Sequence, residues 1–295
     1  MRSIRSAFTL VELTLVIMVF GIVAAISSEI YAKIYENYLV SRVTNSLQTK
    51  TELALEQIAK RLQYRIKAAT IATNPGTNDF KSLVDLDTND NDYKILEWIG
   101  YDDEGFKGIN NNGLPIWSGF ADVNASTADS IITPGSTLTE EDDIIKDLSN
   151  DGASINDAAI IFPVVAQDFD ISKFGWYGND SDYVFNVINS GDEVLNITDS
   201  TQPSLIYERY KLVWTAYAIA PQPLDCIDDC NLTLYWNYQP WQGDIFNNAN
   251  SRSLLAENVT TFKFRQDGDV IRLKLCIKGK IVDKNVSVCK EKVVF

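Results

Sequence analysis

The chain has 295 residues, enough for one sizeable domain, and its 40 acidic side chains against 26 basic ones give a formal net charge of −14. So acidic a chain lacks the basic surface with which proteins bind nucleic acid. The absence of histidine excludes Ser-His-Asp triads, Cys-His dyads and histidine metal ligands, and no Walker-type or dinucleotide-type glycine loop is present, so we expect no enzyme activity.

The first predicted element is a membrane-spanning helix. From Phe8 to Ile26 the chain runs through 19 residues with one charge, no proline and one glycine. At about 1.5 Å per residue this length just crosses a hydrocarbon core of about 30 Å. Arg2 and Arg5 precede the helix without an acidic residue, which predicts a cytoplasmic N-terminus and an extracytoplasmic remainder.

The one charge inside this apolar run is Glu12. A carboxylate at the centre of a membrane helix costs roughly 2.5–3.5 kcal/mol on insertion scales, so it is expected to face a partner or a polar path. No basic residue lies within helical reach inside the membrane. We therefore expect its partner to come from another chain or from chemistry on the chain itself.

The segment AFTLVELTLVIMVFGIVAAI resembles the class III prepilin signal shared by type IV pilins and the pseudopilins of type II secretion. In that family a prepilin peptidase removes a short basic leader before a Phe, the new amine is methylated, and a Glu occupies the fifth mature position. The resemblance implies a leader at residues 1–7, cleavage between Ala7 and Phe8, and methylation of Phe8. It also implies that Glu12 neutralises the terminal ammonium of a neighbouring subunit during assembly. Ala7 departs from the Gly usually found before the cut, which implies slower processing.

Two other readings of this segment remain open. A cleaved secretory signal would use AAISS, residues 24–28, as its cleavage site, and a plain single-span anchor would make Glu12 accidental. Neither gives Glu12 a role.

The helical pattern continues beyond the membrane. Apolar residues recur from Ile30 to Ala69, and neither Pro nor Gly occurs between Ala24 and Asn74, which predicts one helix over 8–72, about 95 Å long, with 8–28 in the membrane. Pro75 ends it. Residues 29–38 carry apolar side chains on more than one side, as in a stalk that contacts several partners, whereas 47–69 has one apolar stripe and is expected to pack on a globular head.

Residues 73–295 are predicted to form that head, mostly as an antiparallel sheet, so that the whole chain is α+β and pilin-like. A short helical turn is expected at 254–259. The segment LLAENVTTFKFRQDGDVIRLKLCI also looks like the C-terminal strand region of J-type minor pseudopilins and of W-type minor pilins. Short β-type runs separated by Gly, Asn, Asp and Pro predict strands at 93–101, 158–165, 182–188, 207–220, 232–240, 259–266, 270–279 and 286–295.

The four cysteines all lie in the part predicted to be outside the cytoplasm, which favours disulfides. Four cysteines allow three pairings. We favour Cys226 with Cys230 and Cys276 with Cys289, because each pair is close in sequence. A four-cysteine zinc site is the alternative, although the spacing fits zinc poorly.

Three further segments are candidate sites. Oxygen side chains alternate as in a calcium loop at Asp85, Asp87, Asn89 and Asn91. The match is incomplete, because Asp90 replaces the turn glycine, Leu96 occupies the last ligand position and Glu97 comes one residue late. The alternative is an acidic surface loop. The acidic run at 140–147 is interpreted as a solvated loop. The aromatic segment 235–243, with residues 226–230, is either core, which we prefer, or a partner-binding tip.

The resemblance and the composition together predict a minor pseudopilin, a single-pass inner-membrane protein built into a periplasmic pseudopilus of type II secretion, at or near its tip. Its expected partners are other minor and major pseudopilins or pilins through the N-terminal helix, the prepilin peptidase, the inner-membrane assembly platform and secreted cargo. A minor pilin of a type IV pilus or of a DNA-uptake pseudopilus is the alternative within this class. A membrane-tethered binding module, calcium-dependent and never assembled, is the alternative from another class.

Overall fold

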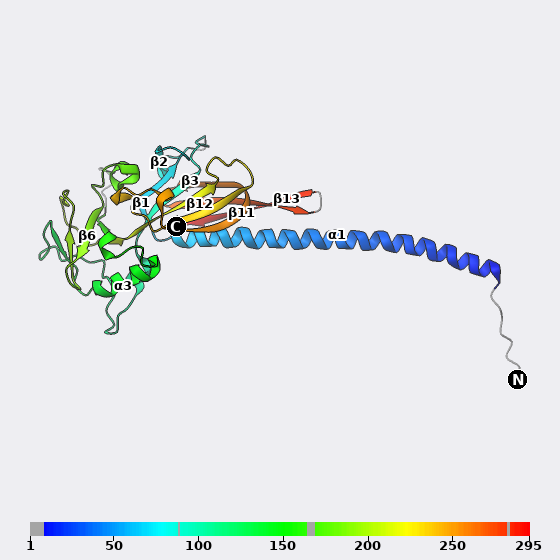
Figure 1. Cartoon of the computed structure of the whole chain (residues 1–295), viewed down its shortest axis with the longest axis horizontal. Coiled ribbons are helices and arrows are strands. Elements are labelled where there is room, and N and C mark those ends of the chain that lie inside the picture. Colours follow the sequence, from blue (N-terminus) through cyan, green and yellow to red (C-terminus); the bar gives the residue numbers. More distant parts are fainter. Residues whose placement is uncertain (1–8, 88, 164–168, 282–283) are drawn as a thin grey trace.

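The computed structural model describes residues 9–87, 89–163, 169–281 and 284–295. Its longest element is the helix α1, Leu10–Leu62, which carries the head at its C-terminal end (Figure 1). With 53 residues, α1 is about 80 Å long. Its N-terminal half is long and apolar enough to cross a membrane, and none of that span is buried against the rest of the protein.

The helix ends earlier than predicted. We expected it to continue to about residue 72, but it ends at Leu62, and Arg65–Thr73 forms strand β1. No proline or glycine marks this change. Ile66, Thr70, Ile71 and Thr73 are β-branched residues that favour a strand, and β1 lies hydrogen-bonded between two other strands, so sheet pairing overrides the helical spacing.

The C-terminal part of α1 packs on one face of an antiparallel sheet of eight strands, whose order is β13-β12-β11-β10-β9-β3-β1-β2. Leu47, Thr51, Ala54, Leu55, Ile58, Ala59 and Leu62 are the buried residues of the helix, and their spacing of three or four puts them on one side. The remaining strands of this sheet are β2 (Phe80–Ser82), β3 (Ile95–Gly100), β9 (Thr215–Gln222), β10 (Cys230–Trp236), β11 (Ser251–Asp267), β12 (Val270–Ile281) and β13 (Lys284–Val294).

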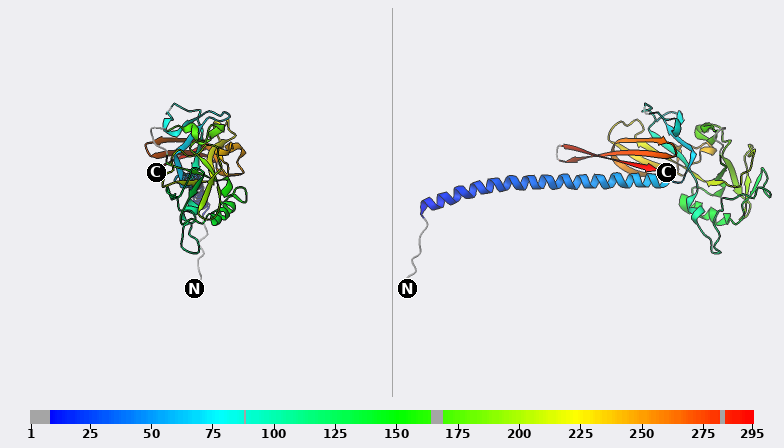
Figure 2. Two further views of the ribbon diagram at one scale, coloured as in Figure 1. Left: turned by 90° about the vertical axis from the view of Figure 1, so that its left-hand side faces the viewer. Right: turned by 180° about the vertical axis from the view of Figure 1, so that it is seen from behind.

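The β12–β13 hairpin runs beside α1 and extends beyond the rest of the head (Figure 2). A Cβ atom on Gly279 of β12 would lie 3.0 Å from Cδ1 of Leu47, so the glycine permits this close approach. Lys290 of β13 pairs with Glu52 of α1 at 2.6 Å, and Lys292 pairs with Glu56 one helical turn further on. The hairpin and the helix are thus joined by both apolar and ionic contacts.

A second core lies on the other face of the large sheet. Ile95 and Ile99 of β3 point into it, whereas Leu96 and Trp98 point toward α1, as strand alternation requires. This second core joins the large sheet to a smaller unit at the end of the head farthest from the N-terminus of α1 (Figure 1).

The smaller unit is a five-stranded antiparallel sheet in the order β4-β7-β6-β5-β8, with the helices α2 (Asp103–Lys107) and α3 (Leu138–Ser149). Its strands are β4 (Ser130–Ile132), β5 (Ala159–Ile161), β6 (Phe185–Asn189), β7 (Val194–Ile197) and β8 (Lys211–Val213). Short 3-10 helices occupy Leu83–Asp85, Ile155–Asp157, Ile171–Phe174, Trp176–Gly178, Pro240–Gln242 and Phe246–Asn248.

The structure is therefore α+β, and each predicted strand overlaps an observed one. Two expectations need correction. Residues 254–259 are not a helical turn but part of β11, where Leu254 and Ala256 pair with β10. The predicted strand over 207–220 is divided at Trp214, because β8 joins the small sheet and β9 joins the large one. The strands β1, β2, β4 and β7 were not expected.

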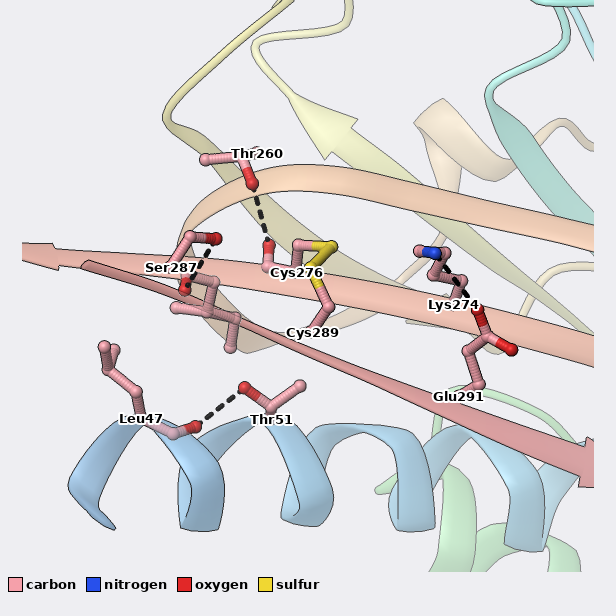
Figure 3. The surroundings of a disulfide bond; sticks show 9 residues. Leu47, Thr51, Thr260, Lys274, Cys276, Ser287, Cys289 and Glu291 are labelled. Atoms are coloured by element: carbon pink, nitrogen blue, oxygen red, sulfur yellow. Dashed lines mark hydrogen bonds and ion pairs between the residues drawn. A yellow bond between two sulfur atoms is a disulfide. The ribbon is translucent and has the colours of Figure 1, made fainter. Parts of the chain in front are cut away.

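The four cysteines form the two expected disulfides, so the thiolates that a zinc site needs are not free. Cys226 pairs with Cys230 within one loop, and Cys276 of β12 pairs with Cys289, which lies directly opposite it on β13 (Figure 3). Disulfides in the head are consistent with an oxidising compartment.

We predict that the Cys276→Ser/Cys289→Ser variant loses more stability than the Cys226→Ser/Cys230→Ser variant. The Cys276–Cys289 disulfide closes a loop with a sequence separation of 13, whereas the Cys226–Cys230 disulfide closes one with a separation of 4. In the chain-entropy model these loops correspond to about 3 and about 2 kcal/mol. Urea unfolding of the full chain in detergent measures both values. Equal losses, or the reverse order, would contradict the prediction.

Candidate assembly helix and candidate sites of the head

Glu12 lies in the first turn of α1 and closes a capping box with Thr9. The Thr9 backbone N–H and hydroxyl donate to Glu12 Oε2 at 3.0 and 2.9 Å, and the Glu12 N–H donates to Thr9 Oγ1 at 3.3 Å. The carboxylate is thereby held at the very start of the helix. The pattern Thr-x-x-Glu is a sequence signature of this motif that our sequence reasoning missed. Ala7 and Phe8, the predicted cleavage and methylation residues, lie outside the described residues.

The membrane-length part of α1 exposes apolar side chains on all its sides. Leu10 is 79% exposed, Phe20 72% and Ile26 56%, and the apolar residues between them are exposed to a similar degree. Such a surface is stable only in lipid or against other apolar helices.

A second exposed apolar surface lies between the membrane segment and the head. We call Ile30, Tyr31, Ile34, Tyr35 and Tyr38 the stalk stripe; each is at least 51% exposed. Tyr38 lies about 18 Å along the helix from Ile26. Headgroups add only about 5–8 Å to each side of the hydrocarbon core, so an upright helix that spans a membrane up to Ile26 would carry Ile34, Tyr35 and Tyr38 beyond it.

The head of the same chain does not cover the stalk stripe. At 3.6 residues per turn the stripe is centred roughly 130° around the helix from the face that packs on the large sheet. The first helix residue buried by the head is Leu47, more than two turns beyond Tyr38. Among the residues that the structure describes, none from the head covers the stalk stripe, which is therefore an exposed apolar surface.

The small sheet encloses a pair of buried carboxyl groups. Asp102 is 2% exposed and Glu141, on α3, is 0% exposed. Trp117 Nε1 donates to Asp102 Oδ2 at 2.7 Å, and Trp214 Nε1 donates to Asp102 Oδ1 at 3.3 Å. A Cβ on Gly105 would lie 1.9 Å from Glu141 Oε2 and 2.3 Å from Asp102 Oδ2, so these two oxygens meet beside the glycine.

The surroundings of this pair raise the pKa of both carboxyl groups. Burial, followed by the charge of Asp102, raises the pKa of Glu141 from its ordinary 4.5 to about 10, and burial also raises the pKa of Asp102. With its pKa raised so far, Glu141 keeps its proton at neutral pH and can donate it in a hydrogen bond to Asp102, whose charge the two indole N–H groups stabilise. Our interpretation of 140–147 as a solvated loop is thus wrong, because the whole segment lies in the helix α3 and Glu141 is buried. The spacing of Leu138, Glu141 and Ile145 at three and four residues is the signal of a buried helix face.

Another buried carboxyl group, Glu97, belongs to the core between the two sheets. Thr73 Oγ1 and Tyr177 OH donate to Glu97 Oε1, both at 2.6 Å, and Tyr238 OH donates to Oε2 at 3.0 Å. Burial raises the pKa of Glu97, and these three hydroxyls oppose the shift. Because Glu97 lies in this core, it is not available as the late ligand of a calcium loop.

Two lysine side chains, Lys81 and Lys263, contact the candidate calcium loop. Lys81 pairs with Asp90 at 3.0 Å, and Asp90 Oδ2 accepts the backbone N–H of Asp87. Lys263 donates to Asn91 Oδ1 at 3.2 Å, and Asn91 Nδ2 donates to the carbonyl of Asn89. Asp85 ends the preceding 3-10 helix. Within the residues that the structure describes, no three Asp, Glu, Cys or His side chains lie close enough together to hold a metal ion.

The aromatic segment 235–243 belongs to the core, as preferred from the sequence. Tyr235, Tyr238 and Trp241 are at most 6% exposed, and all three lie between the two sheets. In the neighbouring 226–230 loop, by contrast, Ile227 is 84% exposed.

No family model, curated protein or solved structure was found to match this chain. Its function must therefore be inferred from the residues and contacts described above.

Proposed function

We propose that this chain is a minor pseudopilin, a structural subunit that assembles through its N-terminal helix into a short periplasmic filament that supports protein export. The stalk stripe carries the proposal, because an exposed apolar surface of this kind marks an interaction site, and a second apolar helix would cover it. A membrane anchor without partners needs no such surface.

Glu12 supports the same proposal. Its carboxylate lies at the start of α1, and Glu12 follows in sequence soon after Phe8, where cleavage would create a new ammonium group. An ammonium from a neighbouring subunit would remove most of the cost of a carboxylate in the membrane. Helix association would then satisfy the charge and the stalk stripe together.

The head suits a minor subunit rather than a repeated one. It comprises residues 65–295 and extends well to the side of the helix axis (Figure 2), so close helical repetition would be crowded. We place the subunit at or near the filament tip, with the other pseudopilins, the prepilin peptidase, the inner-membrane assembly platform and secreted cargo as its partners. Its role is mechanical rather than catalytic.

A minor pilin of a type IV pilus or of a DNA-uptake pseudopilus would share all of these features. The net charge of −14 argues against direct contact with DNA in the last case. Genes encoded beside this one, for a secretion ATPase and secretin or for competence proteins, would distinguish these machines.

Intact mass and N-terminal fragmentation of the protein extracted from membranes of its native host test the proposal. We expect a chain that starts at a methylated Phe8. Retention of residues 1–7, or cleavage after Ala25, would contradict it and would favour a simple anchor or a secreted protein.

A further inference from the structure

Two pairs of like-charged side chains lie directly opposite each other on β11 and β12. Lys263 is opposite Lys274, and Arg265 is opposite Arg272. We call these four residues the basic ladder. Like charges at directly opposed positions destabilise a sheet, so their presence in a chain with a net charge of −14 calls for an explanation.

The basic ladder lies on the face of the sheet that α1 leaves open. Leu273, Leu275 and Ile277 alternate with the ladder positions of β12 and are buried in the core with α1. The ladder residues of β12 therefore point the opposite way. The side chains of Arg265, Arg272 and Lys274 are 50%, 60% and 46% exposed.

Acidic neighbours neutralise only part of this charge. Asp267 is shared between Arg265, at 4.0 Å, and Arg272, at 3.7 Å, and Glu291 pairs with Lys274 at 3.0 Å. Lys263 donates a hydrogen bond to the side-chain amide oxygen of Asn91, which carries no charge. The ion pairs of the ladder thus involve two carboxylates, Asp267 and Glu291, for its four cations.

A cavity of about 550 Å³ adjoins the basic ladder. All four ladder residues line it, together with Lys94 from the 86–94 loop and the exposed Ile227. Asp87 and Asp90 also line the cavity, but Asp90 is already paired with Lys81. Tyr93 and Phe262 provide apolar surface within it.

We infer that the basic ladder and this cavity bind an extended acidic segment of a partner protein, with carboxylates at alternate positions. Residues two apart on an extended chain point the same way and are about 6.6–6.8 Å apart. The two pairs of the ladder are also two residues apart along each strand, so one carboxylate meets each pair. Guanidinium groups bind carboxylates through two parallel hydrogen bonds, which suits Arg265 and Arg272. This inference does not depend on the filament proposal.

Fluorescence anisotropy with the full chain in a nonionic detergent tests the inference. The probe is a labelled peptide of four Glu-Thr repeats at about 50 mM salt, where attraction between exposed charges is only partly screened. We expect it to bind, and we expect a peptide of the same composition with its four Glu in one block to bind more weakly. A Lys-Thr peptide should not bind.

The variant Arg265→Gln/Arg272→Gln should weaken binding of the Glu-Thr peptide at least about ten-fold, as loss of charge-assisted hydrogen bonds predicts. The matched control, Lys50→Gln/Lys60→Gln, removes the same charge from exposed positions on α1 and should change the affinity less than about two-fold. The ladder variant should also unfold at an equal or higher temperature, because it removes an opposed pair of like charges.

The inference is overturned by any of three results. The first is no binding of the Glu-Thr peptide, and the second is an equal loss of affinity in the control variant. The third is displacement of the peptide by inorganic polyphosphate or by phosphatidylglycerol vesicles, if either binds the ladder more tightly than the peptide does. That result would assign the site to a phosphate ligand or to a lipid surface.

Discussion

Glu141→Gln is expected to leave the head folded at neutral pH, whereas Glu141→Ala should lower the free energy of unfolding by about 3–5 kcal/mol. A protonated Glu141 donates a hydrogen bond to Asp102, and the amide of glutamine can donate one in the same place. Alanine removes the donor and leaves the buried Asp102 carboxylate with the indole N–H groups of Trp117 and Trp214 as its remaining side-chain donors. It also leaves a cavity beside Gly105.

The same pair makes stability depend on pH. The pKa of Glu141 is raised in the folded protein to about 10, from 4.5, so between these values the folded chain holds a proton that the unfolded chain has released. Its stabilisation is complete below about pH 4.5 and is lost as the pH rises toward 10, by at most about 1.4 kcal/mol per pH unit. The wild-type protein should therefore be less stable at pH 9 than at pH 6, and Glu141→Gln should flatten this slope.

Urea unfolding of the full chain at pH 5, 7 and 9 measures both effects. Glu140, next to Glu141 on α3, is exposed, so Glu140→Gln removes the same charge and should retain the wild-type slope. The raised pKa of Glu97 leaves a residual slope in every variant. A Glu141→Gln protein with the full wild-type slope would show that Glu141 is not protonated in the folded state.

Glu12→Ala is expected to reduce incorporation of the subunit into filaments by at least about ten-fold while improving its insertion into the membrane. Removal of the carboxylate lowers the insertion cost by roughly 2.5–3.5 kcal/mol but also removes the partner of a neighbouring ammonium. Subunit content of filaments sheared from the native host, compared with the membrane fraction, measures the two effects. A protein that only tethers a binding domain would retain its function in this variant.

A second substitution separates the two roles of Glu12. Glu12→Gln retains an oxygen that can accept from Thr9 and so preserves much of the capping box, but it has no charge. If the carboxylate neutralises an ammonium, Glu12→Gln should assemble as poorly as Glu12→Ala. Normal assembly of the glutamine variant would mean that helix capping is the role of this residue. Thr9→Ser, which keeps the cap, is the matched control and should assemble normally.

The sequence alone was sufficient for the features that depend on neighbouring residues. The long apolar helix, which could span a membrane, follows from an unbroken apolar run, because burial in lipid requires no tertiary contact. The disulfides follow from cysteines that are close in sequence. The strands over 270–279 and 286–295 follow from alternation, since one face of each is buried.

The tertiary structure decided the features that depend on distant residues. α1 ends at Leu62 because the following residues pair with β2 and β3, although their spacing continues the helical pattern. Residues 207–220 are divided at Trp214 because β8 pairs with a strand of the small sheet and β9 pairs with a strand of the large sheet. Glu141 is buried because α3 packs beside Asp102, which is itself held by Trp214, 112 residues along the chain. Local periodicity indicates which face of an element is apolar, but only pairing and packing between distant residues determine what that face contacts. These contacts therefore also determine which acidic residue is solvated and which is buried and protonated.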